Sequence, residues 1–391
     1  MKYYRLTNGR VVSDGNIVDK DVLIMGEKIE AIIPRNTQVS SDYQVIDCTD
    51  KYISAGFVDI HQHGGGGADY MDSEDDTFVK ATMAHLKHGT TSIMPTTLSA
   101  DKDSMLRAVK SYSVARSDPR IKCNLIGLHM EGPYISPKQA GAQKPENIRA
   151  FDEREYREVF EASEDGIRRW SVAPEVEGVE KFAEFALENN IALSIAHSAA
   201  DFDTVLKAFD MGFHHVTHLY SCTSTIERRQ GFRVAGVLEA AYYIDDMNVE
   251  IIADGCHLPH QLLAYVAKFK SSDRIALITD AMRAAGQNTA TSFLGSANDP
   301  LPVIVEDGVA KLVDRSAFAG SVATADRLVR NMLLAGVDLP NAIKMVTENP
   351  IRMMRPDLNK GRIIRGYDAD ICVFDKDINI QNVMCMGEII I

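Results

Sequence analysis

Short apolar stretches recur along the central part of the chain, and segments with a helical pattern lie between most of them. The stretches are rich in β-branched and other apolar residues, which is typical of strands. Two of the intervening segments, 75–89 and 178–190, have the apolar spacing of amphipathic helices. The eight strand-like stretches are residues 56–63, 91–97, 125–134, 169–175, 192–198, 214–220, 249–257 and 274–282.

Eight strands that alternate with helices predict an α/β protein built as a (β/α)8 barrel, or TIM barrel. The alternative is an open, doubly wound sheet. That fold normally places a GxGxxG turn between an early strand and the next helix. The four glycines at 64–67 follow a strand but lack this spacing. The barrel is therefore the favoured fold.

The two ends of the chain differ from its middle. Residues 11–33 alternate apolar and polar positions around two glycine-containing turns, and residues 360–375 have a similar β-rich pattern. We expect the two ends to pair in a small β-sandwich. The predicted domains are this sandwich, residues 1–54 and 358–391, and a barrel of residues 55–357.

Composition and charge argue against two classes of partner. The chain has 391 residues, 25% of them charged, and a formal net charge of -13. A nucleic-acid backbone requires a basic surface, so we do not expect nucleic acid as a partner. No stretch is long and apolar enough to span a bilayer, and the first residues contain no apolar signal core. The six cysteines form no CxxC pair. We therefore expect a cytoplasmic protein with reduced thiols and no membrane partner.

Side chains able to bind metal end six of the eight predicted strands, and five of the eleven histidines are among them. In a (β/α)8 barrel the active site lies at the carboxyl ends of the strands. These side chains are therefore expected to meet at one mouth of the barrel. They are His61, His63, Glu131, His197, His218, His257 and Asp280.

These residue types suit a catalytic metal site. The two histidines of the first strand are two positions apart, so they share one face. His197 and His218 end adjacent strands, and Glu131 adds a hard oxygen donor. Two histidines, a carboxylate and an open position are typical of catalytic zinc rather than structural zinc. Asp280 is then either a further ligand or the proton shuttle for a water that the metal activates.

Each of these residues also has an ordinary structural explanation. A histidine can belong to the core, Glu131 can cap a turn, and Asp280 can cap the next helix. The metal site is favoured because these explanations would have to coincide at one rim. Cys256 as a nucleophile beside His257 is disfavoured, because neighbours in a strand point to opposite faces.

The motifs that carry these residues run in order over nearly the whole chain. The most specific combination is GLHMEGPY at 127–134 with VTHLY at 216–220 and IADGCH at 252–257. The others are SAGFVDIHQHG (54–64), TTSIMPTT (90–97), IAHSAA (195–200), LITDAM (277–282) and AGSVAT (319–324). Together they resemble the amidohydrolase superfamily and, more closely, the N-acetylglucosamine-6-phosphate deacetylase family.

The resemblance implies a role for each residue at the mouth. Glu131, His197 and His218 match the metal ligands of the family. Asp280 matches its general base, and His257 matches a substrate-binding histidine.

The resemblance also implies the metal content. His61 and His63 match a second metal position that only some members keep, so one or two divalent ions per subunit are expected. Zinc is the expected ion, with iron, cobalt and manganese as alternatives. The fourth predicted strand contains no lysine, so the bridging carbamylated lysine of many relatives is absent. Glu131 would have to bridge any pair of ions.

The substrate side departs from the family pattern. Ser221, Cys222 and Thr223 stand where the family usually has Asn-Ala-Met. Gln143 stands near the position of a histidine that some members place beside the substrate carbonyl. The substrate-binding residues that the resemblance implies, besides His257, are Ala142, Gln143, Ser221, Cys222 and Arg229.

Arg229 aligns with an arginine that reaches the phosphate of a neighbouring subunit's substrate. Arg228 and Arg233 are alternatives in the same loop. This resemblance implies a homodimer and a phosphorylated amino-sugar substrate.

The implied reaction removes acetate from N-acetylglucosamine 6-phosphate and gives glucosamine 6-phosphate, with Asp280 as general base and acid. The alternatives are a related enzyme acting on N-acetylgalactosamine 6-phosphate or an N-acyl amino acid, or a catalytically silent scaffold. A cyclic amidase is disfavoured by the missing lysine.

Overall fold

Eight parallel strands form a barrel in the computed structural model, which describes residues 2–72 and 74–391. The barrel closes between its last and first strands. There the N–H of Asp280 donates to the carbonyl of His61 (2.9 Å), and Gln62 forms a parallel β-bridge with Ala281. The predicted (β/α)8 barrel is thereby confirmed. Its strands are β8 (Phe57–Gln62), β11 (Thr90–Thr97), β13 (Leu128–Glu131), β14 (Ile167–Val172), β15 (Ala192–Ile195), β16 (Phe213–Val216), β19 (Asn248–Ile252) and β20 (Ile275–Ile278).

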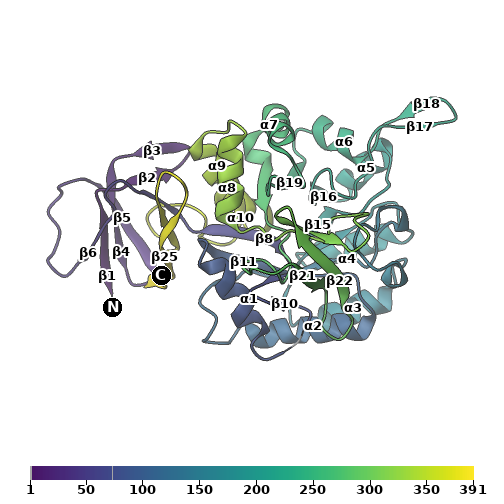
Figure 1. The fold of residues 1–391 in the computed structure, drawn as a ribbon, viewed down its shortest axis with the longest axis horizontal. Helices are drawn as coiled ribbons and strands as arrows, with labels where there is room; N and C mark the ends of the chain where they lie inside the picture. The colour runs from purple at the N-terminus through teal and green to yellow at the C-terminus, as the bar shows by residue number, and fades with distance from the viewer. Residues whose placement is uncertain (1, 73) are drawn as a thin grey trace.

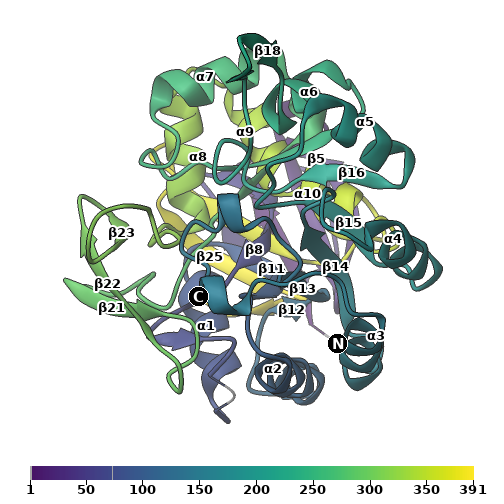
Figure 2. The same ribbon diagram turned by 90° about the vertical axis from the view of Figure 1, so that its right-hand side faces the viewer.

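Helices surround the barrel (Figure 2). They are α1 (Thr77–Leu86), α2 (Lys102–Ala115), α3 (Glu153–Ala162), α4 (Val179–Glu188), α5 (Phe202–Asp210), α6 (Val237–Tyr243), α7 (His260–Phe269), α8 (Ala325–Leu334), α9 (Leu339–Val346) and α10 (Glu348–Met354). Aspartates cap several N-termini, as Asp101 does for α2 and Asp201 for α5 by accepting from backbone N–H groups. The apolar face of α4 buries Phe182 against Trp170 of β14, with the rings 5.1 Å apart. The main core therefore lies between the strands and the helices.

The two ends of the chain meet in one body of sheets, on the left of Figure 1 in purple and yellow. The two sheets have the orders β5-β4-β1-β6 and β26-β25-β24-β7-β2-β3. Strand β7 pairs antiparallel with β24, which joins the N-terminal segment to the C-terminal one. The strands are β1 (Tyr3–Thr7), β2 (Arg10–Ser13), β3 (Asn16–Val18), β4 (Lys20–Met25), β5 (Lys28–Pro34), β6 (Gln44–Asp47), β7 (Tyr52–Ala55), β24 (Ile371–Phe374), β25 (Ile380–Cys385) and β26 (Glu388–Ile389).

A shared apolar core holds these two sheets together. It includes Leu6 and Ile24 from the first sheet and Ile53 and Ile371 from the second. The expected β-sandwich from both ends of the chain is therefore present. The domain boundaries, 54/55 and 357/358, stay a prediction.

Three antiparallel elements decorate the barrel. A hairpin of β17 (Glu227–Arg229) and β18 (Phe232–Val234) projects from the molecule at the upper right of Figure 1. A sheet of β21 (Thr291–Leu294), β22 (Leu301–Glu306) and β23 (Val309–Leu312) follows the last barrel strand. The glycine run forms a small hairpin, β9 (Gly64–Gly65) with β10 (Ala68–Asp69). Among the described residues, no helix is both long and apolar enough to cross a membrane.

Candidate active site

The barrel strands place the predicted metal-binding side chains at a single mouth. Glu131 is the last residue of β13, and His197, His218 and Asp280 each lie two residues past the end of β15, β16 or β20. The last three have φ values of 46°, 29° and 48°. Residues other than glycine rarely adopt this left-handed conformation, and such residues cluster at functional sites.

One group of ligands consists of Glu131, His197 and His218. The Nε2 atoms of His218 and His197 lie 3.0 Å and 3.4 Å from Oε1 of Glu131. All three side chains are buried, and their ligand atoms lie within 4.8 Å of one another. The two histidines follow neighbouring parallel strands, β15 and β16, as the sequence predicts.

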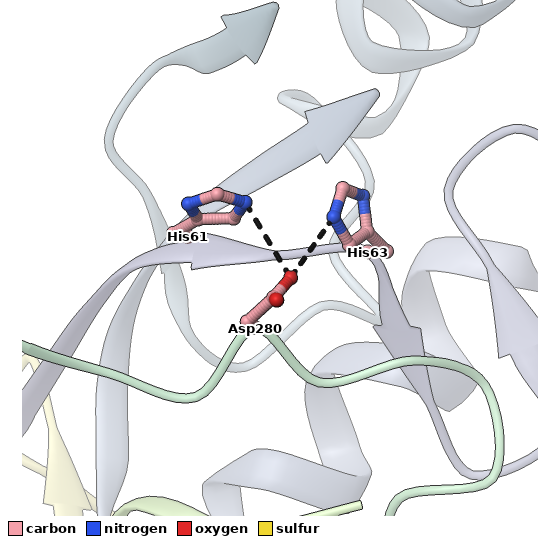
Figure 3. Close-up of side chains that lie close together, drawn as sticks. All are labelled: His61, His63 and Asp280. Carbon is pink, nitrogen blue, oxygen red and sulfur yellow. Dashed lines mark ion pairs between the residues drawn. The ribbon is translucent and has the colours of Figure 1, made fainter. Parts of the chain in front are cut away.

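A second group consists of His61, His63 and Asp280, which Figure 3 shows converging on the aspartate. Oδ1 of Asp280 lies 3.1 Å from Nε2 of His63 and 3.5 Å from Nε2 of His61. Glu131 stands between the two groups, because its Oε1 is 3.5 Å from Nε2 of His61 and its Oε2 is 3.5 Å from Nε2 of His63. Its carboxylate therefore faces all four histidines.

Backbone carbonyls orient three of these four histidines. Nδ1 of His63 lies 3.3 Å from the carbonyl oxygen of Thr96. Nδ1 of His197 lies 2.7 Å from that of Gln139, and Nδ1 of His218 lies 3.1 Å from that of Ser221. When the ring is neutral, an Nδ1–H that donates to a carbonyl leaves Nε2 as the unprotonated nitrogen that a metal requires.

The charges in the site favour an ionised base. Burial raises the pKa of Asp280, but the hydrogen bond and positive charge of His63, with the charge of His61, lower it below its usual value. Burial likewise raises the pKa of Glu131, and the histidines around it, His61 first, lower it well below its usual value. Both carboxylates are therefore negatively charged at neutral pH.

The donor set fits a divalent metal ion. Buried imidazole nitrogens and carboxylate oxygens converge, and Nε2 of His61 has no hydrogen-bond partner among the described residues. An orphaned buried polar atom is costly unless something binds it. Nitrogen and carboxylate ligands suit several divalent ions.

A cavity of about 310 Å³ opens above both ligand groups. The predicted substrate residues Ala142, Gln143, Ser221, Cys222 and His257 line it. Nδ1 of His257 pairs with Asp254 at 2.9 Å. Further residues that line the cavity were not predicted from the sequence, and they include Leu98, Tyr220, Leu294 and Phe318. Leu294 ends β21, so the unpredicted sheet contributes to the cavity wall.

Gln143 contacts a metal ligand directly. Its Nε2 donates to Oε2 of Glu131 (2.7 Å), and its Oε1 accepts from the N–H of Ser99 (2.9 Å). The side chain is buried. Its amide thus holds one oxygen of Glu131, while the other oxygen faces His197 and His218. A direct contact between Gln143 and the substrate stays a prediction.

Arg229 is not among the described residues that line this cavity. It is on β17 of the projecting hairpin, its side chain is half-exposed, and it pairs with Glu227 and, at 3.6 Å, with Asp201. Its neighbours Arg228 and Arg233 are exposed on the same hairpin. Arg229 therefore lies away from the cavity of its own chain, and a role in a neighbour's site stays a prediction.

Two charged residues beneath the mouth were not singled out from the sequence. Glu250 of β19 and Arg169 of β14 form an ion pair inside the barrel, and both are buried. Burial raises the pKa of Glu250, but Arg169 and then His61 lower it to about 2. The signal for them is a charged residue within a barrel strand.

The comparisons with known proteins agree with this geometry. The model of the amidohydrolase family matches residues 52–390. The N-acetylglucosamine-6-phosphate deacetylase of Lysinibacillus sphaericus is 31% identical over 340 residues, which cover 87% of this chain and 85% of the relative. The N-acetylgalactosamine-6-phosphate deacetylase of Shewanella sp. (strain ANA-3) is 31% identical over 395 residues, 98% of this chain and 94% of the relative.

A solved structure gives the same result for the fold. The N-acetylglucosamine-6-phosphate deacetylase of Pasteurella multocida matches with a TM-score of 0.91 and 27% identity, and covers 99% of each chain. Barrel, sandwich and ligand groups thus occur in a chain that matches these relatives over nearly its whole length. This chain belongs to the amidohydrolase family and, within it, to the N-acetylglucosamine-6-phosphate deacetylase family.

Proposed function

We propose that the protein removes acetate from N-acetylglucosamine 6-phosphate and releases glucosamine 6-phosphate. The observation that carries the proposal is the convergence of Glu131, His197, His218 and Asp280 at one cavity. The relatives named above support the substrate class, because two of them are named as deacetylases of this sugar phosphate.

Residues of this chain would hold the metal. Glu131, His197 and His218 would bind one divalent ion, and His61 with His63 and Asp280 would bind a second. Zinc is the proposed ion, because histidine with one carboxylate is its usual catalytic ligand set. A bound divalent ion supplies a Lewis acid that lowers the pKa of water and polarises a carbonyl group.

Asp280 is the proposed general base and acid. Its carboxylate accepts the proton of the attacking water and later delivers it to the leaving nitrogen of the amide. A carboxylate is ordinarily ionised at neutral pH, so Asp280 starts as a base. Gln143 keeps the carboxylate of Glu131 oriented during this sequence.

The substrate is held by the walls of the cavity. Because Nδ1 of His257 faces Asp254, its Nε2 is available to the sugar phosphate. The N–H of Ser221 already donates to the carbonyl of His218 (2.8 Å), so its hydroxyl is the group proposed to meet the substrate. Cys222 and Ala142 complete this wall.

The working unit is proposed to be a homodimer in the cytoplasm. The projecting hairpin exposes Arg229 and the apolar Phe232, and Ile226 directly before the hairpin is also exposed. This combination suits a contact in which the arginine meets the phosphate in the neighbouring subunit. All six cysteines are unpaired, which suits a reducing compartment.

N-acetylgalactosamine 6-phosphate is the second candidate substrate. The Shewanella relative named for that activity is 31% identical over 98% of this chain, as similar as the Lysinibacillus relative. The two sugars differ only in the orientation of one hydroxyl group, so both fit the same chemistry.

A substrate panel separates these candidates. Acetate release is measured on both N-acetylhexosamine 6-phosphates, on unphosphorylated N-acetylglucosamine and on an N-acetyl amino acid. We expect the highest kcat/KM on N-acetylglucosamine 6-phosphate and a large loss without the phosphate. A preference for the galactosamine epimer moves the assignment to the second candidate. Equal rates with and without phosphate would reject the sugar-phosphate assignment.

A further inference from the structure

His61 differs from the other three histidines of the site. Where His63, His197 and His218 each face a backbone carbonyl with Nδ1, the Nδ1 of His61 faces a carboxylate. Oε2 of Glu250 lies 3.5 Å from it. Both ring nitrogens of His61 lack a hydrogen-bond partner within the described part of the chain.

Glu250 is itself held from below by Arg169. The two side chains form an ion pair in the barrel interior, and neither is more than 2% exposed. A buried carboxylate without a partner is strongly destabilising, so the guanidinium is what allows Glu250 to stay ionised beside His61.

The guanidinium has little freedom to move. Its Nε donates to Oγ of Ser194 (3.0 Å), and its Nη2 donates to Oγ1 of Thr217 (2.8 Å). Its Nη1 donates to the carbonyl of Ile60 (3.2 Å), the residue before His61. Arg169 therefore fixes both the carboxylate and the strand that carries the histidine.

A stability role does not explain this pair. Replacing a buried ion pair by well-packed hydrophobic residues of similar volume often leaves stability unchanged or raises it. A buried pair that points at a ligand-set histidine has a second use. An imidazole that binds a cation through Nε2 must carry its proton on Nδ1, and a carboxylate that accepts this proton makes the ring a stronger ligand.

We propose that Glu250, held by Arg169, is a positioning residue that enables His61 to bind a divalent cation together with His63 and Asp280. The inference rests on the proposed metal-dependent function. Under this inference, Glu250 and Arg169 set the affinity of the second ion. The ion at Glu131, His197 and His218 does not need them, because backbone carbonyls orient those two histidines.

The test is metal binding by E250Q, which keeps the size of the side chain and removes its charge. Protein stripped by a chelator is titrated with Co²⁺, and the number of ions and their affinities are measured by calorimetry. We expect two ions in the wild type. In E250Q we expect one affinity to fall about 10- to 100-fold and the other to change by less than about threefold.

Two further variants separate this role from general damage. D21N is the matched control, because Asp21 is a buried carboxylate paired with Arg5 in the small sandwich, and it should keep both affinities. In a protein that already carries H61N, adding E250Q should cause no further loss of metal affinity.

Several outcomes overturn the inference. They are one ion in the wild type, unchanged affinities in E250Q, and a further loss in the H61N background. If E250Q does not fold, the double variant R169M/E250Q removes both charges and should lose the same ion; two ions at wild-type affinity there also overturn it. Two bound ions without acetate release would reject the proposed function alone.

Discussion

The residues that carry the proposed chemistry are held in a strained backbone conformation. His197, His218 and Asp280 have positive φ values directly after their strands. Each such residue costs about 1–3 kcal/mol and persists only where the surroundings fix it. The backbone of Asp280 is fixed on both sides, since its N–H donates to His61 and its carbonyl accepts from the N–H of Ser321 (2.7 Å). The carboxylate is therefore aimed at the site before any substrate binds.

Asp280→Asn tests the role of this carboxylate. The amide has the same shape but cannot accept the proton of water, so kcat should fall by about 10²- to 10⁴-fold. The ion at Glu131, His197 and His218 should remain, because Asp280 is not part of that group. Steady-state kinetics and metal analysis of the same preparation check both statements. A variant with near wild-type kcat contradicts the assignment.

Gly141→Ala tests how closely the cavity wall is packed. A Cβ at Gly141, whose φ is +58°, would lie 2.5 Å from Sγ of Cys222 and 3.5 Å from Cε1 of His197. We expect a higher KM, since the wall must move, and a loss of stability of about 1–3 kcal/mol from overpacking besides the backbone strain.

Gly15→Ala is the matched control for that variant. Gly15 also has positive φ (+70°) but nothing lies within 4 Å of its added Cβ. The free energy of unfolding of this variant should fall by about 1–2 kcal/mol because of the backbone conformation alone, and its KM should not change. Urea unfolding and steady-state kinetics of both variants check this. An unchanged KM in Gly141→Ala would contradict the packing argument.

At the scale of elements, the ends of the barrel strands can be predicted from the sequence. The additional sheets outside the barrel are harder to predict. Apolar strands of a barrel are continuous in sequence, so Glu131 and His197 stand out where the apolar run stops. Glu250 was missed because a charge inside a strand can face solvent or the barrel interior, and only the closed barrel decides between them. The sheet of β21, β22 and β23 was missed although Asp307-Gly308 is a hairpin signal.

The β17–β18 hairpin gives the prediction that belongs to this scale. If Arg229 completes a neighbour's site, Arg229→Gln should raise KM for the phosphorylated substrate. A mixture of Arg229→Gln and Asp280→Asn chains, unfolded and refolded together, should then be more active than the sum of its parts. One site of each mixed dimer combines an intact Asp280 with an intact Arg229.

Size and mixing measurements provide the controls for this prediction. Light scattering should give a dimer for the wild type and for both variants. Acetate release by the mixture that equals the sum of the separate variants contradicts a shared site.

At the scale of the whole molecule, closing the barrel and building the site are the same event. The N–H groups of His63 and Gly64 both donate to the carbonyl of Ala281, at 2.8 Å and 3.0 Å, where the first strand meets the last. This junction brings His61 and His63 to Asp280, although they are far apart in the sequence. The sequence predicts this contact only through the count of eight strands, because the first and last strands become neighbours only when the barrel closes.

The central claim is that a divalent cation at this mouth, with Asp280, carries out amide hydrolysis. The most direct test is acetate release from N-acetylglucosamine 6-phosphate by protein stripped with a chelator and then reloaded with Zn²⁺ in steps. We expect the stripped protein to lose nearly all activity and the rate to return in proportion to bound metal. Full activity in the stripped protein, or none in the fully reloaded protein, would contradict it.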